Sequence, residues 1–546
     1  MIESYKSYMR KTSRYKKHIS KTNKYKEYMS HKRKKIYIFL GLAIFALTFF
    51  CVMIDFSFLR IYQGIPSMYN LVERMLSPNL SYTQEVFSKL LETIEIAVTS
   101  SFVGVLLAMP FALLTAGNIT PSRHVAMILN RFFAFLRTIP NLIWAALLVS
   151  VFSIGQFSGI VALTITGFLI ALKLFRENIE TINENLLNST KSVGANQIQV
   201  LRYCVLPTIL ELAASVFFMV LEINIRSATV LGLVGAGGIG QIMWRDLNHL
   251  RYDNLATLVL ILLLTIGTID ALSFIVRRYI KRSFILHQSI ESYKRAPQKR
   301  ILQLILLSIV LGFWIMNAID INYARLIMGL EQGYLMISRM IRFEWAYVPR
   351  LLEGIRESFF IAIFATMTGA IGALFLSFFT AYNTAPLKVT SFLTKGMVNL
   401  LRTFPPIVTA IIFFRGVGPG PLAGAMALSI YTTGVLTKLY SEVIENSHEN
   451  IKNSILVTGS TNLNAFRYGI LPETLPAFIS LVLYRLESNI RTSTILGIIG
   501  AGGIGTILSM NITWRNWERV GLLILGISIM IMSIDVLSYY LRKRLV

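Results

Sequence analysis

The sequence has little of what a soluble enzyme or a disulfide-stabilised domain requires. Of its 546 residues only 15% are charged and two are cysteines, whereas 54% are hydrophobic, and the mean hydropathy is +0.60. Cys51 and Cys204 lie far apart in or beside apolar stretches, so they indicate neither a disulfide framework nor a cysteine metal site. The six histidines show no metal-ligand spacing, and we expect no bound metal. The composition predicts an integral membrane protein without a large soluble domain.

Apolar runs of nearly bilayer length recur along the chain after residue 35. Because about 20 apolar residues cross the hydrocarbon core, we expect an all-α, polytopic membrane protein with about 12 transmembrane helices. In the first half the expected spans are 36–54, 93–115, 139–157, 160–174, 208–223 and 255–276. In the second half they are 301–318, 358–380, 407–417, 422–439, 475–486 and 520–541.

Basic residues are concentrated beside these apolar runs. Residues 1–35 carry 13 basic and two acidic side chains, and residues 277–300 carry eight and one, out of a formal net charge of +25. Short basic segments next to spans mark the cytoplasmic face, so we expect both termini in the cytoplasm and no nucleic-acid partner. The basic tail is either an unstructured anchor or an amphipathic helix on anionic lipid.

The chain contains an internal repeat with an offset of 265 residues. Residues 116–121 (AGNITP) match 381–386 (AYNTAP), 136–140 (LRTIP) match 401–405 (LRTFP), and 222–226 (EINIR) match 487–491 (ESNIR). The offset needs no gap from about residue 92 to the end. Since each half carries an even number of spans, the two halves are parallel repeats that enclose a shared pathway. This arrangement favours transport.

Each repeat has a polar, helix-compatible segment between its fourth and fifth spans, at 176–207 and 440–472. Both segments end in Leu-Pro, and a glycine, Gly194 or Gly459, stands thirteen residues before that proline. A glycine between two short helical stretches predicts a turn. The segments therefore offer two equivalent helix-turn-helix elements to a cytoplasmic partner.

These segments resemble the coupling loops of ABC importer permeases, and the flanking motifs are similar to phosphonate-transport permeases. The resemblance rests on 188–195 (NSTKSVGA), 453–460 (NSILVTGS), 136–144 (LRTIPNLIW) and 224–240 (NIRSATVLGLVGAGGIG). It implies two fused permease domains, 36–285 and 301–546, with a basic tail at 1–35 and a basic linker at 286–300. The implied coupling residues are Asn188, Gly194, Leu206, Pro207, Asn453, Gly459, Leu471 and Pro472.

The resemblance also implies the partners. These are a cytoplasmic ABC ATPase dimer, an extracellular or periplasmic substrate-binding protein and the lipid bilayer of the cell membrane. ATP and magnesium belong on the ATPase, since this chain has no G-x-x-x-x-G-K-[ST] loop and is not itself an enzyme. The chain departs from the family where the loop usually begins Glu-Ala-Ala. Docking then depends on nearby charges, namely Glu184, Lys191, Arg202, Glu445, Lys452 and Arg467, or on loop shape.

Gly235 to Gly240 and the copy from Gly500 to Gly505 match the dinucleotide pattern G-x-G-x-x-G. That pattern requires a preceding strand in a soluble βαβ unit, whereas here it joins two spans. Close backbone packing in a turn and an anion contact through exposed amides both remain open. We place Gly237 and Gly502 beside the candidate translocation path.

Two pairs of opposite charge are expected at the outer ends of the fifth spans. Glu222 and Arg226, and their copies Glu487 and Arg491, are spaced four apart and so share a helix face. Each pair is either a local ion pair or one side of a cationic constriction on the path that favours a small oxyanion. Arg137 and Arg402 allow the same two interpretations.

The favoured function is that of the membrane subunit of an ATP-driven importer, which moves phosphonate or a related small oxyanion inward by alternating access. The alternative is an ion-gradient-driven secondary transporter, which has the same two parallel six-helix halves. Such carriers bury carboxylates in mid-span, and we expect the carboxylates here nearer the span ends, namely Asp270, Asp535, Glu222 and Glu487. A membrane enzyme lacks any clustered catalytic set here.

Overall fold

The computed structural model describes residues 48–49, 51–120, 122–182, 184–285, 323–447 and 449–545. The chain forms two compact units, residues 1–56 and 57–546. In the first unit, residues 48–49 and 51–53 are helical, and the Phe56 amide donates to the Cys51 carbonyl. The expected span 301–318 and most of 36–54 lie outside the described residues, so the fold is analysed from residue 57 onward.

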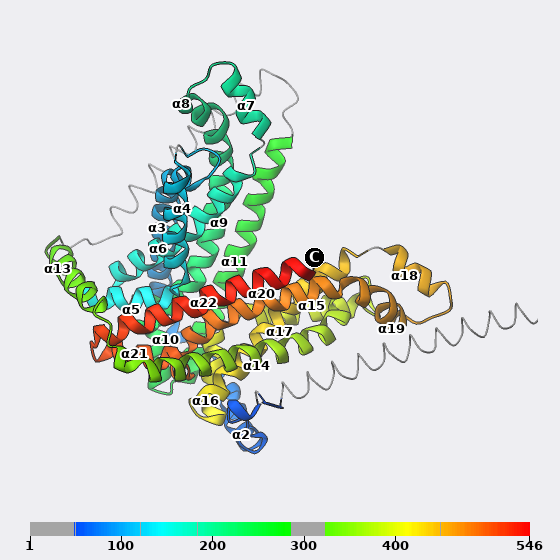
Figure 1. Ribbon diagram of the computed structural model, residues 1–546. Helices are drawn as coiled ribbons and strands as arrows, with labels where there is room; N and C mark the ends of the chain where they lie inside the picture. Colours follow the sequence, from blue (N-terminus) through cyan, green and yellow to red (C-terminus); the bar gives the residue numbers. More distant parts are fainter. Residues whose placement is uncertain are drawn as a thin grey trace, which may run out of the picture. The chain divides into compact units, whose positions relative to one another are not determined.

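Among the described residues, the second unit contains two series of ten α-helices in the same order (Figure 1). The first series is α2 (Phe58–Met75), α3 (Thr83–Thr115), α4 (Arg123–Thr138), α5 (Asn141–Phe152), α6 (Gln156–Glu180), α7 (Glu184–Ser192), α8 (Gln197–Val200), α9 (Leu206–Leu231), α10 (Ile239–Asn248) and α11 (Tyr252–Ile285). The second is α13 (Tyr323–Met340), α14 (Val348–Thr380), α15 (Lys388–Thr403), α16 (Pro406–Val417), α17 (Pro421–Glu445), α18 (Glu449–Leu456), α19 (Asn462–Ala465), α20 (Leu471–Ile498), α21 (Ile504–Thr513) and α22 (Trp517–Leu545).

Every helix of the second series begins 265 residues after its counterpart. The structural repeat therefore reaches back to α2 and α13, further than the sequence match from about residue 92 indicated. Eight of the described helices are long and apolar enough to cross a membrane, and two bent helix pairs raise the number to ten. The chain is an all-α, multi-pass membrane protein.

The expected span 139–157 is wrong as a single helix. The 12-residue α5 ends at Phe152, and Ser153 and Gly155, with φ values of +71° and +150°, separate it from α6. At the start of the expected span, α4 and α5 form a pair bent by 85°. The bend follows from Pro140, because the residue before a proline avoids helical angles, and Ile139 has a ψ of 118°. The second repeat bends by 83° at the equivalent place, between α15 and α16.

The two repeats pack against each other through exchanged helices. Helix α2 lies on α16 of the second repeat, and α13 lies on α5 of the first. The backbones of Gly64 and Gly416 approach so closely that a Cβ on Gly64 would stand 2.3 Å from the Gly416 carbonyl oxygen. A hydrophobic core that includes Ile143, Ile490 and Leu523 also joins the repeats. The two halves are thus interlocked.

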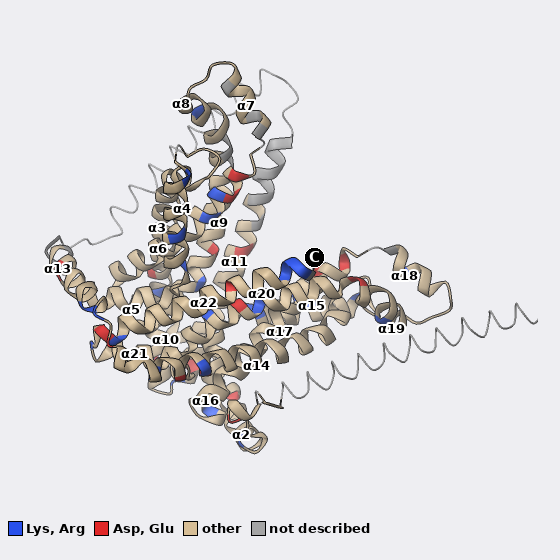
Figure 2. Ribbon diagram, in the orientation of Figure 1, with Lys and Arg blue, Asp and Glu red and all other residues tan. Residues whose placement is uncertain are grey.

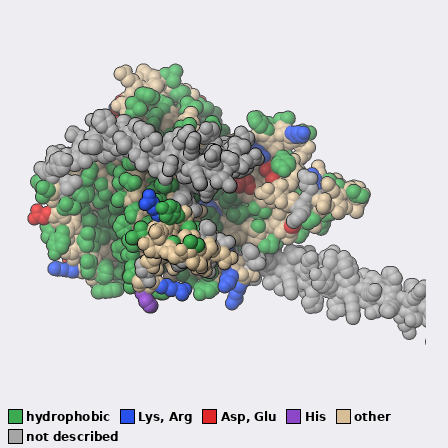
Figure 3. Space-filling model, turned by 90° about the horizontal axis from the view of Figure 1, so that it is seen from above, with side chains coloured by type: hydrophobic (Ala, Val, Ile, Leu, Met, Phe, Trp, Pro, Cys, Tyr) green, Lys and Arg blue, Asp and Glu red, His purple; other side chains and the backbone are tan. Residues whose placement is uncertain are grey.

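Exposed apolar stripes run along α2 and α13. Tyr62 and Tyr69 are 66% and 68% exposed, and their counterparts Ile327 and Tyr334 are 67% and 75% exposed. Residues seven apart on a helix lie on nearly the same face. Figure 3 shows hydrophobic side chains over much of one face of the molecule. Such surfaces are typical of a protein whose surroundings are lipid.

Candidate coupling loops and translocation path

The predicted helix-turn-helix elements are present in both repeats. Helices α7 and α8 project beyond the start of α9, and α18 and α19 project in the same way beyond the start of α20 (Figure 1). Gly194 and Gly459 have φ values of +89° and +80°, a left-handed conformation that favours glycine. A Cβ would meet nothing within 4 Å at either position. The backbone angle, and not lack of space, therefore calls for glycine at these two turns.

Side-chain caps fix the second short helix of each element. Asn196 accepts from the Gln199 amide at 2.9 Å, and the Gln199 side chain accepts in return from the Asn196 amide. In the second repeat Thr461 accepts from the Asn464 amide at 3.4 Å. Such caps satisfy amides that the first turn of a helix leaves unpaired. The equivalent elements thus end in defined, exposed tips.

The exposed tips carry apolar side chains, whereas the sequence predicted docking through charged residues or loop shape. Ile198 and its counterpart Leu463 are 74% and 60% exposed, and Tyr203 and Tyr468 are 67% and 65% exposed. Of the charges considered for docking, Glu445 accepts from Lys395 and Lys452 donates to the Asn383 carbonyl. Those two charges are engaged within the repeat. The four apolar side chains were missed because their exposure depends on the turn geometry.

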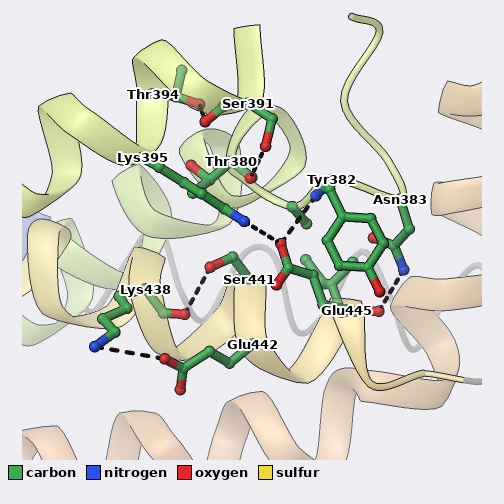
Figure 4. Close-up of polar contacts among 12 residues, drawn as sticks. Thr380, Tyr382, Asn383, Ser391, Thr394, Lys395, Lys438, Ser441, Glu442 and Glu445 are labelled. Atoms are coloured by element: carbon green, nitrogen blue, oxygen red, sulfur yellow. Dashed lines mark hydrogen bonds and ion pairs between the residues drawn. The ribbon is translucent and has the colours of Figure 1, made fainter. Parts of the chain in front are cut away.

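The repeated motif at 116–121 and 381–386 forms a loop between α3 and α4 in the first repeat and between α14 and α15 in the second. Each loop also contacts the end of a third helix, α6 or α17. Asn118 Nδ2 donates to the Ile179 carbonyl, and Asn383 Nδ2 donates to the Ile444 carbonyl, both at 2.8 Å. Figure 4 shows this junction in the second repeat, where Asn383 and Tyr382 face the end of α17. Since Lys452 of α18 also binds the Asn383 carbonyl, the coupling element is attached to the end of a spanning helix.

The charge at this junction comes from different helices in the two repeats. In the second repeat Lys395 Nζ of α15 donates to Glu445 Oε1 at 2.8 Å. In the first repeat Asn130 replaces that lysine, and Arg176 of α6 lies between Asn130 (2.8 Å) and Glu180 (3.9 Å). Both repeats therefore neutralise the equivalent glutamate, although the cation has moved from one helix to another.

The two arginines of the candidate path are both held by pairs of carboxylates. Arg226 Nη2 lies 2.9 Å from Glu222 Oε1 and 2.7 Å from Asp270 Oδ2. Arg491 lies 2.7 Å from Glu487 and 3.2 Å from Asp535. Figure 2 shows charges of both signs on α20 and α22. The spacing predicted the helix pairs Glu222–Arg226 and Glu487–Arg491, whereas the contribution of the aspartates required the fold.

The depth of Arg226 differs from the sequence interpretation. Arg226 binds Asp270, which stands 18 residues, or about 27 Å, along α11 from its start at Tyr252. Asp270 therefore lies three residues before the end of the candidate span Tyr252–Ser273, in agreement with its expected position. Arg226 instead lies inside the candidate span Leu212–Val234 and not at its outer end. The first group has one cation and two carboxylates, and the second has a further cation, Arg542, whose Nη2 lies 3.8 Å from Glu487 Oε2. Neither set of ion pairs has excess positive charge. Arg137, at the end of α4, interacts electrostatically with Arg491 and Asp535 of the other repeat.

The glycine-rich turns at Gly237 and Gly502 are bound by glutamates of the same repeat. The Gly238 amide donates to Glu92 Oε1 at 2.9 Å, and the Gly503 amide donates to Glu357 Oε2 at 2.9 Å. Gly237 and Gly502 have φ values of +87° and +77°. A nucleotide pattern needs a preceding strand, and helices or helical turns precede both turns in the described chain. The contacts support a packing turn whose amides already have an internal anion.

One buried cation in a spanning helix was not predicted from the sequence. Arg485 of α20 is only 6% exposed, and its guanidinium carbon lies 4.8 Å from the centre of the Tyr431 ring. Its position in the first repeat is occupied by Val220. Comparison of the two repeats was the available signal. Among the described residues, no group of three or more His, Cys, Asp or Glu is arranged to hold a metal.

A family match decides the identity of the fold. Residues 108–285 and 373–546 each match the binding-protein-dependent transport system inner membrane component. The chain belongs to this family. Its members are the permease subunits of ABC importers, so the chain is a transport component and not an enzyme, and an ATP-driven importer is supported over a gradient-driven carrier.

Several curated relatives are permeases of phosphorus oxyanion transporters. The chain is 28% identical over 498 residues to the phosphate-import permease protein PhnE of Mycolicibacterium smegmatis, which covers 90% of this chain and 92% of that protein. It is 30% identical to the putative phosphite transport system permease protein HtxC of Stutzerimonas stutzeri, over 41% of this chain and 79% of that protein. The first match spans both repeats, as expected for a fused permease.

Two further similarities cover only part of the chain. The putative cryptic phosphonate transport system permease protein PhnE2 of Escherichia coli is 40% identical over 22% of this chain and 99% of its own length. Among solved structures, the MetNI methionine ABC transporter in an inward-facing conformation matches 37% of this chain and 100% of that chain. It has 16% sequence identity and a TM-score of 0.35.

Proposed function

We propose that this permease imports a small phosphorus oxyanion, namely phosphonate, phosphite or phosphate, through the cell membrane into the cytoplasm. The observation that carries the proposal is the presence of two permease repeats in one chain, each with its own coupling element. The relatives that transport phosphate and phosphite support it. A cytoplasmic ATPase dimer with ATP and magnesium, and an external substrate-binding protein, complete the transporter. Both termini lie in the cytoplasm, and the permease domains comprise residues 36–285 and 301–546.

The coupling elements transmit movement of the ATPase to the spans by alternating access. In this proposal Asn188, Gly194 and Leu206–Pro207 with Asn453, Gly459 and Leu471–Pro472 form the docking loops. Ile198, Tyr203, Leu463 and Tyr468 supply apolar contacts there, which offset the missing Glu-Ala-Ala. Closure of the ATPase dimer draws the loops together and opens the path outward, and hydrolysis returns it inward. The junctions at Glu180 and Glu445 carry the movement into α6 and α17.

The translocation path passes the ion groups Glu222–Arg226 and Glu487–Arg491 and the turns at Gly237 and Gly502. Because each arginine already has two carboxylate partners, these groups set the positions of α9 against α11 and α20 against α22. They leave little positive charge for a transported anion. The helix movements of the cycle then occur around these fixed contacts.

Uptake of labelled methylphosphonate, phosphite and phosphate into vesicles that contain the permease, its ATPase and its binding protein tests the proposal. We expect uptake of at least one of these anions that requires the ATPase and survives collapse of the ion gradient. Uptake that is independent of the ATPase and stops with the gradient would refute the coupling mechanism. Uptake of none of the three would refute the substrate class.

A pair of glycine variants tests the coupling elements. Gly194→Val and Gly459→Val force a branched side chain into a left-handed conformation, so we expect ATP-driven uptake to fall and the ATPase to dissociate more readily. Gly396→Ala is the matched control, because a Cβ there meets nothing within 4 Å. Equal uptake by the turn variants and the control would contradict a coupling role for these loops.

A further inference from the structure

Arg485 is a buried cation without an acidic partner. Its Nη1 donates to Ser488 Oγ at 3.4 Å, while Nε and Nη2 are buried and make no hydrogen bond. The phenols of Tyr431 and Tyr484 add electrostatic contacts. No ion pair joins Arg485 to a carboxylate within the described ranges, whereas Arg491 on the same helix has two. The guanidinium thus retains unused donors.

The surroundings of Arg485 are peculiar to the second repeat. The positions equivalent to Tyr484, Arg485 and Ser488 are Met219, Val220 and Ile223, and Val220 is fully buried. The position equivalent to Tyr431 is Thr166. The first repeat therefore has three apolar side chains and the hydroxyl of Thr166 where the second presents a guanidinium, two phenols and a hydroxyl. The packing of the shared fold does not require the arginine, since the first repeat folds in the same way without it.

The position of Arg485 in the spans makes an unpaired charge costly. Arg485 is the fifteenth of 28 residues in α20, and Tyr431 is the eleventh of 25 in α17, so both stand near the middle of their helices. A charge inside a membrane protein is normally paired or lines a path for ions or substrates. A guanidinium can donate two parallel hydrogen bonds to a carboxylate or to two oxygens of a phosphate.

We propose that Arg485, with Tyr431 and Ser488, binds the oxyanion during transport, and that the second repeat alone carries this site. The inference rests on the proposed function and names where its substrate is held. Two free guanidinium nitrogens and the neighbouring hydroxyls provide donors for a tetrahedral anion. In the conformation described here the site is closed to solvent, and separation of α17 from α20 during the cycle opens it. The ion groups at Arg226 and Arg491 hold the helices, while Arg485 holds the substrate.

Substitution of Arg485 by methionine tests the site. We expect Arg485→Met to lower uptake at subsaturating anion by about tenfold or more, the effect of one lost charge-assisted hydrogen bond, mainly through a higher KM. We expect the same variant to be more heat-stable without the anion, because an unneutralised buried charge is removed. Arg485→Lys should keep part of the affinity. The matched control is Val220→Ala at the equivalent position, which should leave KM unchanged.

A second measurement keeps the proposal decidable if Arg485→Met fails to assemble. Millimolar methylphosphonate, phosphite or phosphate should raise the melting temperature of the wild-type complex, and Arg485→Lys should reduce that shift. Wild-type uptake together with an unchanged KM in Arg485→Met, or a wild-type melting temperature that none of the anions raises, would overturn the site and leave the importer intact. Absence of oxyanion uptake in the wild type would instead refute the proposed function.

Discussion

The ion pair of Glu445 at the coupling junction can be rebuilt with a cation from another helix. This rebuilding tests whether the junctions of the two repeats are equivalent. In the second repeat Lys395→Asn removes the partner of Glu445, whose side chain is 18% exposed while that of the lysine is 42% exposed. Exposed ion pairs contribute about 0.2 to 1 kcal/mol. The low exposure of Glu445 places this pair at the upper end, so we expect a loss of about 1 kcal/mol. Addition of Ser441→Arg recreates the arrangement of Asn130 and Arg176 in the first repeat.

The double-mutant cycle distinguishes a shared junction from two unrelated contacts. We expect Lys395→Asn with Ser441→Arg to recover most of the lost stability, with a coupling energy of at least about 0.5 kcal/mol. Thermal unfolding of the solubilised complex measures the recovery, and ATP-driven uptake shows whether the junction also transmits movement from α18. A double variant no more stable than Lys395→Asn alone would refute the reasoning, because the arginine would then be unable to replace the lysine.

Two further predictions concern single contacts. Arg519 donates to Glu344 at 2.8 and 2.9 Å and holds the pKa of that carboxyl below its ordinary value. The pair therefore stabilises the fold at neutral pH, and this contribution disappears as the pH falls below about 4.3 and through the lowered pKa. The difference in melting temperature between wild type and Glu344→Gln should narrow at acid pH, and a constant difference would contradict this assignment. Gly505→Ala should prevent assembly, because a Cβ there would stand 1.9 Å from the Thr494 carbonyl oxygen. Gly267→Ala is the control and should assemble normally, because a Cβ there would meet nothing within 4 Å. Gel filtration of both variants measures assembly, and an assembled Gly505→Ala would contradict this prediction.

The repeat made much of the fold predictable from sequence. One offset placed the helices of both halves, and glycine with a following Leu-Pro predicted the turns at Gly194 and Gly459 that the structure contains. The break from Ser153 to Gly155 was missed, since the expected span 139–157 runs across it and hydropathy alone does not register the end of a helix. Asp270 was expected only as a carboxylate near a span end, and its ion pair was missed because its partner Arg226 comes from another helix. The contact of Glu92 with the Gly238 amide likewise joins residues that only tertiary packing brings together.

At one contact between helices, both side chains have changed jointly between the repeats. Asn79 and Asn254 share a hydrogen bond of 2.9 Å in the first repeat, and both of their counterparts are charged, so that Glu344 and Arg519 form an ion pair.

Arg485 does not follow this pattern of compensated change. Its neighbours Tyr484 and Ser488 are more polar than their counterparts Met219 and Ile223 of the first repeat, yet neither of them is acidic. The Tyr431 ring lies 4.8 Å from the guanidinium carbon but carries no negative charge, whereas the lysine at the coupling junction has a carboxylate partner. A buried guanidinium needs a negative partner, and the chain supplies hydroxyls there instead. We therefore infer that a transported anion, bound transiently, supplies the negative charge. We therefore expect the oxyanion site in the second repeat, at Arg485, while the first repeat has the apolar side chain of Val220 at the equivalent position.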